Sequence, residues 1–483
     1  MKSSSTHSQQ MANGTMWTAL ERFSIIGIQL LCTFVLARFL APADFGLMGM
    51  LMVFTLIGNT LSEAGFSQAL IREREVSEQT RSTVFWANML LSLVVYGLLW
   101  LAAPLIAQFY HEPLLIDVSR ATFLVIPCGA ACLIQVTHYT RQLNFRRICL
   151  VSLTSSLISC GVAIALAWRY HSVWALVVQN VLVYLLRAIL YWVTSHWLPR
   201  WQFCWSELRR LLSFSHSLML SYLIGNLFSN IYTILIGRFY GTTEAGYFTQ
   251  ADRIRVVASN SSTSVIQSVS YPILTSVHHE GGDLKASYRR IILIALLCVG
   301  LAMTLVMGVS QDLFELVMGS PAWRLSGQYL LPLGIAGILF PLHSVNENIL
   351  LVKGKSRTVF WLEVTRRCLM VLLLIGFLRF RIGIFVWSYA LYSFLLLFIN
   401  LRVCGRPIGY STREQLRDIL PLLECFALTF VVAQISNHYL CFATPLLRLA
   451  ITLTISTAVG LALCSRLSAF RDVITLIRFT AKS

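Results

Sequence analysis

This 483-residue sequence has few charged residues: only 12% are Asp, Glu, Lys or Arg. A soluble protein has about a quarter of its residues charged, because its surface must be covered with groups that water solvates. Hydrophobic residues make up 57% of the chain, and the mean hydropathy is +0.70. The composition therefore excludes a soluble globular protein and predicts an all-α polytopic membrane protein.

Other absences narrow the function. The sequence contains no G-x-x-x-x-G-K-[ST] phosphate-binding loop, so we expect no direct use of ATP and no cofactor. The net charge of +17 comes without a zinc-finger, RNP-like or basic-helix pattern, so nucleic acid is not an expected partner. Cys128 and Cys132 share a helix face, but no second pair or His cluster joins them, so we expect free thiols and no metal site.

Fourteen apolar segments have the length of about 20 residues that spans a bilayer. The first, eighth and eleventh carry charged residues and are the least apolar of the set. Residues 1–16 are polar and are expected to be a disordered cytoplasmic N-terminus, and residues 466–483 form a basic cytoplasmic tail. The predicted spans are 17–38, 45–66, 83–107, 115–136, 150–168, 173–195, 212–237, 246–274, 289–309, 326–350, 359–378, 382–401, 416–435 and 445–465.

The positive charges alternate between the two ends of these spans. With the N-terminus in the cytoplasm, 24 of the 38 Lys and Arg residues fall in cytoplasmic segments and seven on the opposite side. Cytoplasmic connections of membrane proteins carry such an excess of Lys and Arg. The pattern predicts an even number of spans and cytoplasmic N- and C-termini.

The connections on the non-cytoplasmic side are short. The longest, around residues 108–114 and 310–325, offer His111, Glu112, Asp312 and Glu315 without a recognisable acid–base pair. A membrane-embedded polysaccharide-assembly enzyme would need a substantial outer loop that carries such a pair. We therefore expect no enzyme, and this alternative is the weakest one.

One phrase of the sequence occurs twice. "LARFLAPADFG" at residues 36–46 returns as "IGRFYGTTEAG" at residues 236–246, with identical residues at 38/238, 39/239 and 46/246. Six predicted spans separate the copies, so both face the same way across the membrane. Either the match is chance, or the chain has two parallel repeats, an architecture of transporters. The repeats predict six-helix lobes at 17–200 and 212–401 around a central cavity, with two further helices at 416–465.

Several ionisable or amide side chains fall inside the predicted spans, where they are costly and usually face a cavity or one another. Arg255 is the clearest, because it lies about 13 Å along an ideal helix from Gly246. The candidate substrate-binding residues are Arg22, Arg253 and Arg255. The candidates for cavity lining or ion coupling are Glu21, Glu63, Asp252, Asn226, Asn230, Glu363, Arg366 and Arg367.

Each group also has a purely structural interpretation, and both interpretations stay open. Arg22 could extend to the cytoplasmic interface. Arg253 and Arg255 could be neutralised by Asp252 and helix packing, and Glu363 has the helical spacing to pair with Arg366 and Arg367. If these groups line a cavity, the excess of Arg favours an anionic cargo, because a guanidinium donates two parallel hydrogen bonds to phosphate.

Four stretches carry a resemblance to a known family: "VLARFLAPADFGLMGMLMVF", "LSEAGFSQALIRE", "STVFWANMLLSLVVYGLLWLAAPLIAQFY" and "RQLNFRR". They resemble polysaccharide transporters of the multidrug/oligosaccharidyl-lipid/polysaccharide exporter superfamily, and within it the Wzx-type flippases of lipid-linked oligosaccharides, of the colanic-acid exporter kind. The resemblance is strongest over residues 17–150, continues through 212–357 and is weak after about residue 400.

The resemblance implies two six-helix bundles plus two helices, and alternating access around the cavity. The implied cargo is an undecaprenyl-diphosphate-linked repeat unit that moves from the cytoplasmic to the periplasmic leaflet during exopolysaccharide assembly. Cationic residues of the first and eighth helices are thought to meet the diphosphate in such proteins, and Arg22 and Arg255 match that role best here. A polysaccharide polymerase and co-polymerase are candidate partners, and Glu21, Glu63 and Asp252 are candidate proton or sodium sites.

The main alternative is a cation-coupled multidrug antiporter of the same superfamily. Such a protein exports cationic small molecules, and an Arg-rich cavity would repel them. The sequence does not identify the sugar, the coupling ion or the oligomeric state.

Overall fold

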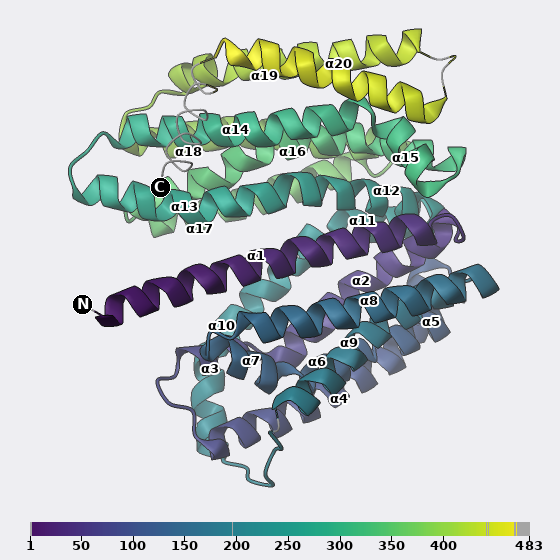
Figure 1. Cartoon of the computed structure of the whole chain (residues 1–483), viewed down its shortest axis with the longest axis vertical. Coiled ribbons are helices and arrows are strands. Elements are labelled where there is room, and N and C mark those ends of the chain that lie inside the picture. The colour runs from purple at the N-terminus through teal and green to yellow at the C-terminus, as the bar shows by residue number, and fades with distance from the viewer. Residues whose placement is uncertain (1, 196, 441, 443, 468–469, 471–483) are drawn as a thin grey trace. The chain divides into compact units, whose positions relative to one another are not determined.

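The computed structural model describes residues 2–195, 197–440, 442, 444–467 and 470, and within them it contains helices and no strand (Figure 1). The all-α prediction is therefore confirmed. The helices are α1 (Lys2–Leu36), α2 (Pro42–Glu63), α3 (Phe66–Arg72), α4 (Glu78–Tyr110), α5 (Leu115–Thr122), α6 (Val125–Ala130), α7 (Leu133–Arg141), α8 (Phe145–Tyr170), α9 (Trp174–Ser195), α10 (Trp205–Ser229), α11 (Ile231–Phe239), α12 (Thr242–Arg255), the π-helix η1 (Val256–Asn260), α13 (Ser261–His279), α14 (Leu284–Gly308), α15 (Ser310–Met318), η2 (Pro321–Trp323), α16 (Arg324–Val352), α17 (Ser356–Phe377), α18 (Ile382–Gly405), η3 (Arg406–Ile408), α19 (Thr412–Tyr439) and α20 (Pro445–Ser465).

Ten helices in the described part of the chain are long and apolar enough to cross a membrane, and two bent helix pairs raise the number to twelve. The exact count of fourteen is therefore not confirmed. The two remaining predicted spans fall on α12–η1–α13 and on α17. α12 ends at Arg255 after 14 residues, where the π-helix begins. Both segments also carry charged residues, such as Asp252 and Arg255 in α12 and Glu363 in α17, so neither forms one long apolar helix.

The N-terminal residues differ from expectation. We expected residues 1–16 to be disordered, but α1 starts at Lys2 and continues without a break to Leu36. The polar residues extend the helix because none of them is a proline that would stop it. In the C-terminal tail at 466–483, the structure describes only Arg466, Leu467 and Phe470.

The chain divides into two compact units, residues 1–246 and 247–483. In the first unit, α8 packs along both α1 and α9, and α2 packs against α4 (Figure 1). α10 lies against α2, α3 and α4, so residues 205–229 pack with the earlier helices. The predicted lobes place residues 212–246 with the later helices, and that assignment stays a prediction.

Hydrogen bonds and one aromatic stack attach the connection between α9 and α10 to the first turns of α4. The indole N–H of Trp197 donates to Glu78 Oε1 at 2.6 Å, and the backbone N–H of Cys204 donates to Thr83 Oγ1 at 3.0 Å. The indole N–H of Trp86 donates to the carbonyl of Arg200, and its ring stacks on Trp201 with the centroids 4.3 Å apart. These contacts fix where α10 begins, which positions its inner face against α2 and α3.

The two copies of the repeated phrase meet inside the first unit. α2 starts at Pro42 and α12 at Thr242, so the two helices begin at the same position of each copy. A Cβ built on Gly46 would overlap the carbonyl oxygen of Thr242, and one on Gly246 would overlap that of Pro42. This reciprocal contact needs glycine at both positions, and it favours duplication over a chance match.

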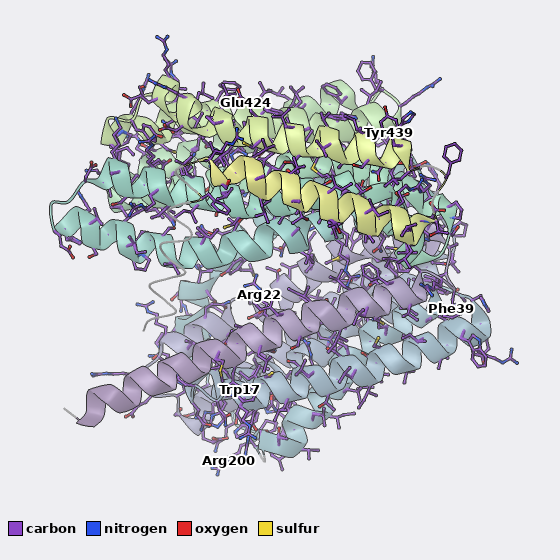
Figure 2. All side chains as sticks on the ribbon, turned by 45° about the horizontal axis from the view of Figure 1, so that its top comes forward. Trp17, Arg22, Phe39, Arg200, Glu424 and Tyr439 are labelled. Carbon is purple, nitrogen blue, oxygen red and sulfur yellow. The ribbon has the colours of Figure 1, made fainter. Side chains whose placement is uncertain are left out.

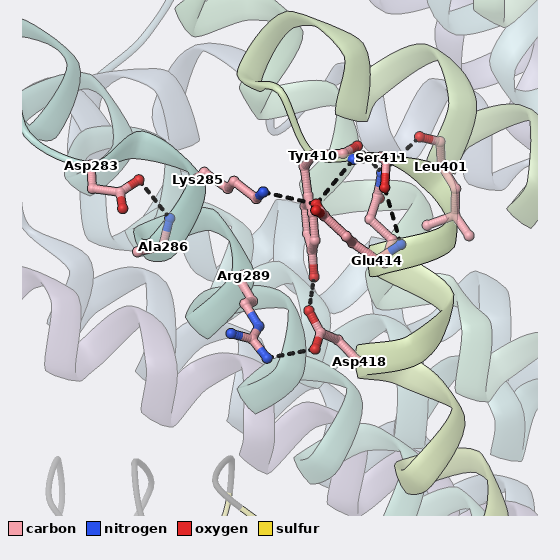
Figure 3. Close-up of polar contacts among 10 residues, drawn as sticks. Asp283, Lys285, Ala286, Arg289, Leu401, Tyr410, Ser411, Glu414 and Asp418 are labelled. Atoms are coloured by element: carbon pink, nitrogen blue, oxygen red, sulfur yellow. Dashed lines mark hydrogen bonds and ion pairs between the residues drawn. The ribbon is translucent and has the colours of Figure 1, made fainter.

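In the second unit, α16 packs against α14 and α18, and α19 packs against both α14 and α20. Ion pairs attach α19 to the start of α14: Lys285 Nζ lies 2.8 Å from Glu414 Oε2, and Arg289 Nη2 lies 2.5 Å from Asp418 Oδ1 (Figure 3). Tyr410 donates to Asp418 as well, at 2.5 Å, and burial raises the pKa of this tyrosine. The two extra helices predicted at 416–465 thus correspond to α19 and α20.

Candidate functional site: a buried arginine pair and an open pocket

Arg255 is the most enclosed of the predicted substrate-binding residues. It is the last residue of α12 and only 7% exposed. Its Nε donates to Asp252 Oδ1, one helical turn earlier, at 2.6 Å. Its guanidinium carbon lies 5.4 Å from the ring centroid of Tyr389 on α18, a distance at which the ring face attracts a cation.

The helix geometry changes directly after Arg255. Residues 256–260 form the π-helix η1, and π-bulges frequently occur at functional sites. The hydroxyl of Ser259 donates to the carbonyl of Gly337 at 2.8 Å, which ties η1 to α16. A Cβ on Gly337 would lie 3.2 Å from Arg255 Cγ, so the glycine lets α16 approach the arginine closely.

The bond to Asp252 uses one side of the Arg255 guanidinium. Within the part of the chain that the structure describes, Nη1 and Nη2 make no hydrogen bond. The pair carries no net charge, as the structural interpretation expected, but it leaves one edge of the guanidinium available. That edge is the one that could donate two parallel hydrogen bonds to a phosphate group.

Arg366 on α17 forms a second buried network. Its Nη1 donates to Glu347 and also to Glu363 Oε1, the latter at 2.7 Å, and its Nη2 donates to Asn400 Oδ1 at 3.0 Å. Arg367 Nη2 lies 3.4 Å from Glu363 Oε2. The predicted salt bridges within α17 are therefore present, and Glu347 on α16 adds a carboxylate that balances the charge of the two arginines.

Glu347, His343 and Asn400 were not among the residues predicted from the sequence. Asn400 Nδ2 lies 2.7 Å from His343 Nδ1, so α16, α17 and α18 share one polar network. The signal for it was the polar run "HSVNEN" at residues 343–348, inside an otherwise apolar predicted span. A polar run in the middle of a span predicts side chains that satisfy one another or face water.

The remaining charged candidates are less enclosed. Arg253 on α12 is half-buried. On α1, Glu21 is half-buried and Arg22 is exposed (Figure 2). Arg22 belongs to the first unit and Arg255 to the second, and their convergence on one diphosphate stays a prediction.

The first unit contains an open pocket of about 340 Å³. It brings together two predicted residues from distant parts of the chain, Glu63 at the end of α2 and Asn226 on α10. Asn226 Nδ2 donates to Thr60 Oγ1 at 3.0 Å and its carbonyl accepts from Asn230 Nδ2 at 2.9 Å. The pocket is lined by Thr60, Glu63, Gly65, Gln68, Met219, Tyr222 and Asn226.

The local fold explains how α2, α3 and α10 make this pocket. Ala64 and Gly65 both have positive φ, of 47° and 73°, so the chain turns sharply between α2 and α3. A Cβ on Gly65 would lie 2.7 Å from the Cβ of Ser215, so only glycine lets α10 come this close. Glu63 therefore stands on one side of the turn and Gln68 on the other.

Nothing in the described part of the chain gathers three or more His, Cys, Asp or Glu side chains in a geometry for a metal ion.

Comparisons with known proteins give a consistent result. A family model described as polysaccharide biosynthesis protein matches residues 35–325. The teichuronic acid biosynthesis protein TuaB of Bacillus subtilis is 27% identical over 471 residues, which cover 94% of each chain. The lipopolysaccharide biosynthesis protein WzxC of Escherichia coli is 24% identical over 75% of this chain and 74% of its own. Among solved structures, the lipid II flippase MurJ in an inward closed conformation superposes with a TM-score of 0.69 and 13% identity, over 95% of this chain and 100% of MurJ.

Proposed function

Since this chain belongs to the polysaccharide biosynthesis protein family, we propose that it translocates undecaprenyl-diphosphate-linked oligosaccharide repeat units for exopolysaccharide assembly. It is a multi-pass membrane protein, and the proposed direction is from the cytoplasmic to the periplasmic leaflet of the inner membrane. Both termini then face the cytoplasm, where the sequence concentrates Lys and Arg. The fold it shares with MurJ is compatible with such a role.

The observation that carries the proposal is the buried Arg255 with one edge of its guanidinium available. A buried cation in a membrane protein is expensive unless it is neutralised, and Asp252 neutralises it in the structure. An arriving diphosphate offers Arg255 a second anionic partner with matching geometry. Arg22 and Arg253 are proposed to contribute positive charge to the same cargo.

Translocation then follows from alternating access. The headgroup moves through the predicted central cavity while the lipid tail stays in the bilayer, and binding must differ between the two states for net movement to occur. An ion gradient is the proposed energy source, with Glu21 and Asp252 as candidate proton or sodium sites. A polymerase and a co-polymerase that use the exported repeat unit are proposed partners, and this chain acts as a transporter and not as an enzyme.

The test is a deletion in the native host. Secreted polysaccharide and the lipid-diphosphate-linked repeat units of the inner membrane are measured together. Loss of polymer with accumulation of the repeat unit on the cytoplasmic face is the expected result. Normal polymer with altered sensitivity to cationic toxins would refute the proposal and favour the drug-antiporter alternative.

A further inference from the structure

The pocket of the first unit contains one charged side chain, Glu63, for which the described residues supply no counter-ion. Glu63 is half-buried, and no Lys, Arg or His among the described residues forms an ion pair with it. Two other predicted carboxylates, Asp252 and Glu363, each form an ion pair with an arginine. A carboxylate without a counter-ion in a membrane segment costs free energy, so its retention calls for a ligand that donates hydrogen bonds to it.

The polar wall of the pocket continues on both sides of Glu63. The side-chain oxygen of Gln68 is buried and has no hydrogen-bond partner among the described residues. Asn226 donates its amide to Thr60, which leaves its side-chain oxygen for other donors. The side chains of Glu63, Gln68 and Asn226 line one space from α2, α3 and α10, and a carboxylate together with two amides suits a ligand that is rich in hydroxyl groups.

The α10 side of the pocket also offers an apolar surface. Met219 and Tyr222 lie three residues apart on α10, with Asn226 four residues further on, so all three share one face of the helix. The side chain of Tyr222 is 50% exposed, so its ring is available to a ligand. A pyranose has the matching character, with hydroxyl groups around its edge and a C–H face that packs on an aromatic ring.

The size of the pocket separates a sugar from an inorganic cation. A volume of about 340 Å³ falls in the range of small-molecule sites. A bare cation instead needs several oxygen ligands that converge at about 2.0–2.6 Å, and this pocket supplies a single carboxylate in an open space. A polyhydroxylated ring fits the volume, the acceptors and the apolar wall together.

From these observations we propose that the pocket formed by Glu63, Gln68, Tyr222 and Asn226 is a sugar subsite that binds a pyranose ring of the transported repeat unit. The inference rests on the proposed function, and it adds a site in the first unit to the arginine site of the second. Glu63 accepts hydrogen bonds from ring hydroxyls, and Tyr222 packs on the ring face. The sugar part of the cargo is thus recognised separately from its diphosphate.

The experiment compares two probes on the full-length protein in lipid nanodiscs. One probe is undecaprenyl diphosphate that carries the repeat unit, extracted from the native host, and the other is undecaprenyl diphosphate without sugar. We expect the wild type to bind the sugar-bearing lipid more tightly. Glu63→Gln should weaken that binding about tenfold, because a neutral amide oxygen accepts hydrogen bonds more weakly than a carboxylate, and should leave binding of the sugar-free lipid unchanged.

Two further variants make the result specific. Tyr222→Leu keeps an apolar side chain but removes the aromatic face, and it should also weaken only the sugar-bearing probe. Glu75→Gln removes an exposed carboxylate outside the pocket and should change neither affinity. Because unchanged binding of the sugar-free lipid itself reports a folded protein, a loss caused by misfolding is recognised at once.

The outcomes distinguish this inference from the function on which it rests. If the wild type binds neither probe, the proposed function fails and the subsite fails with it. If the wild type binds both probes but Glu63→Gln and Tyr222→Leu change both affinities equally, or neither, the flippase remains and the sugar subsite is wrong. If Glu63→Gln removes only a dependence on sodium or pH, the pocket is an ion site and the inference is overturned.

Discussion

Replacing Asp252 by Asn is expected to strengthen the binding of undecaprenyl diphosphate. In the structure Asp252 occupies the Nε side of Arg255 at 2.6 Å, so its negative charge lies beside the guanidinium edge where the proposed ligand would bind, and the two anions repel each other. Asn keeps the shape of the side chain but removes that charge. Relief of this repulsion predicts about 10- to 100-fold tighter binding, which corresponds to about 1.4–2.8 kcal/mol.

The same substitution should lower the stability of the free protein. Removal of one partner of a buried ion pair costs about 3–5 kcal/mol, because the other charge is left uncompensated, and Arg255 is only 7% exposed. An anionic ligand would supply the missing charge. The variant should therefore melt at a lower temperature than the wild type without ligand and show a larger rise in melting temperature when undecaprenyl diphosphate is added.

A matched control separates the site from a general effect of broken ion pairs. Asp312 is 3% exposed and accepts from Arg448, in the same unit as Arg255 but on α15 and α20. Asp312→Asn should destabilise the protein without any gain in affinity. The reasoning is refuted if Asp252→Asn, purified as a folded protein, binds the lipid no more tightly than the wild type or shows the same thermal shift.

Three other substitutions have distinct expected results. Arg255→Lys should retain only part of the export activity, because lysine cannot donate two parallel hydrogen bonds; full export in a deletion host would show that a point charge is sufficient. Arg366→Ala leaves Glu347 and Glu363 without the guanidinium that both contact, so it should lower the free energy of unfolding by about 3–5 kcal/mol. An unchanged melting curve would contradict the buried network. Gly46→Ala should sharply lower the yield of folded protein in size-exclusion chromatography, because the added Cβ overlaps the backbone at Thr242. Gly27 has open space around it, so Gly27→Ala should behave like the wild type in the same assay.

The sequence predicted the fold class well because membrane insertion imposes a simple rule of length and composition. The repeated phrase was visible in the sequence, and its two copies mark the starts of α2 and α12, while the division into two repeats stays a prediction. The sequence could not establish the number of spans, because α12 and α17 carry charges that are paired within the helix or, for Arg366, also with Glu347 of α16. Hydropathy assigns a paired arginine the same value as an exposed one. Membership of α10 in the first compact unit depends on contacts with α2, α3 and α4, which no local pattern encodes.

Partners on the same helix could be predicted from the sequence, but partners on other helices could not. Intramembrane charge identified Arg255 and Arg366, and helical spacing identified Asp252 and Glu363 as neighbours. Glu347 is 19 residues from Arg366 in the sequence, and Tyr222 is more than 150 residues from Glu63. Such pairs form only when separate helices pack together, so a single sequence indicates that polar groups are present but not which of them meet.

The balance of charge in the second unit bears directly on how a flippase could release its cargo. Asp252 neutralises Arg255, and Glu347 and Glu363 neutralise Arg366 and Arg367. If the diphosphate binds the open edge of Arg255 as proposed, it shares the guanidinium with a carboxylate that the protein itself supplies. The nearby carboxylate limits the affinity for the diphosphate, and it keeps Arg255 neutralised when the lipid leaves. A transporter gains net movement only from differences in affinity between its states, so a shift of Asp252 toward or away from Arg255 would be enough to change the affinity of the site. An arginine without such a partner would hold the diphosphate in every state, and the variant Asp252→Asn should accordingly bind its cargo tightly and export it slowly.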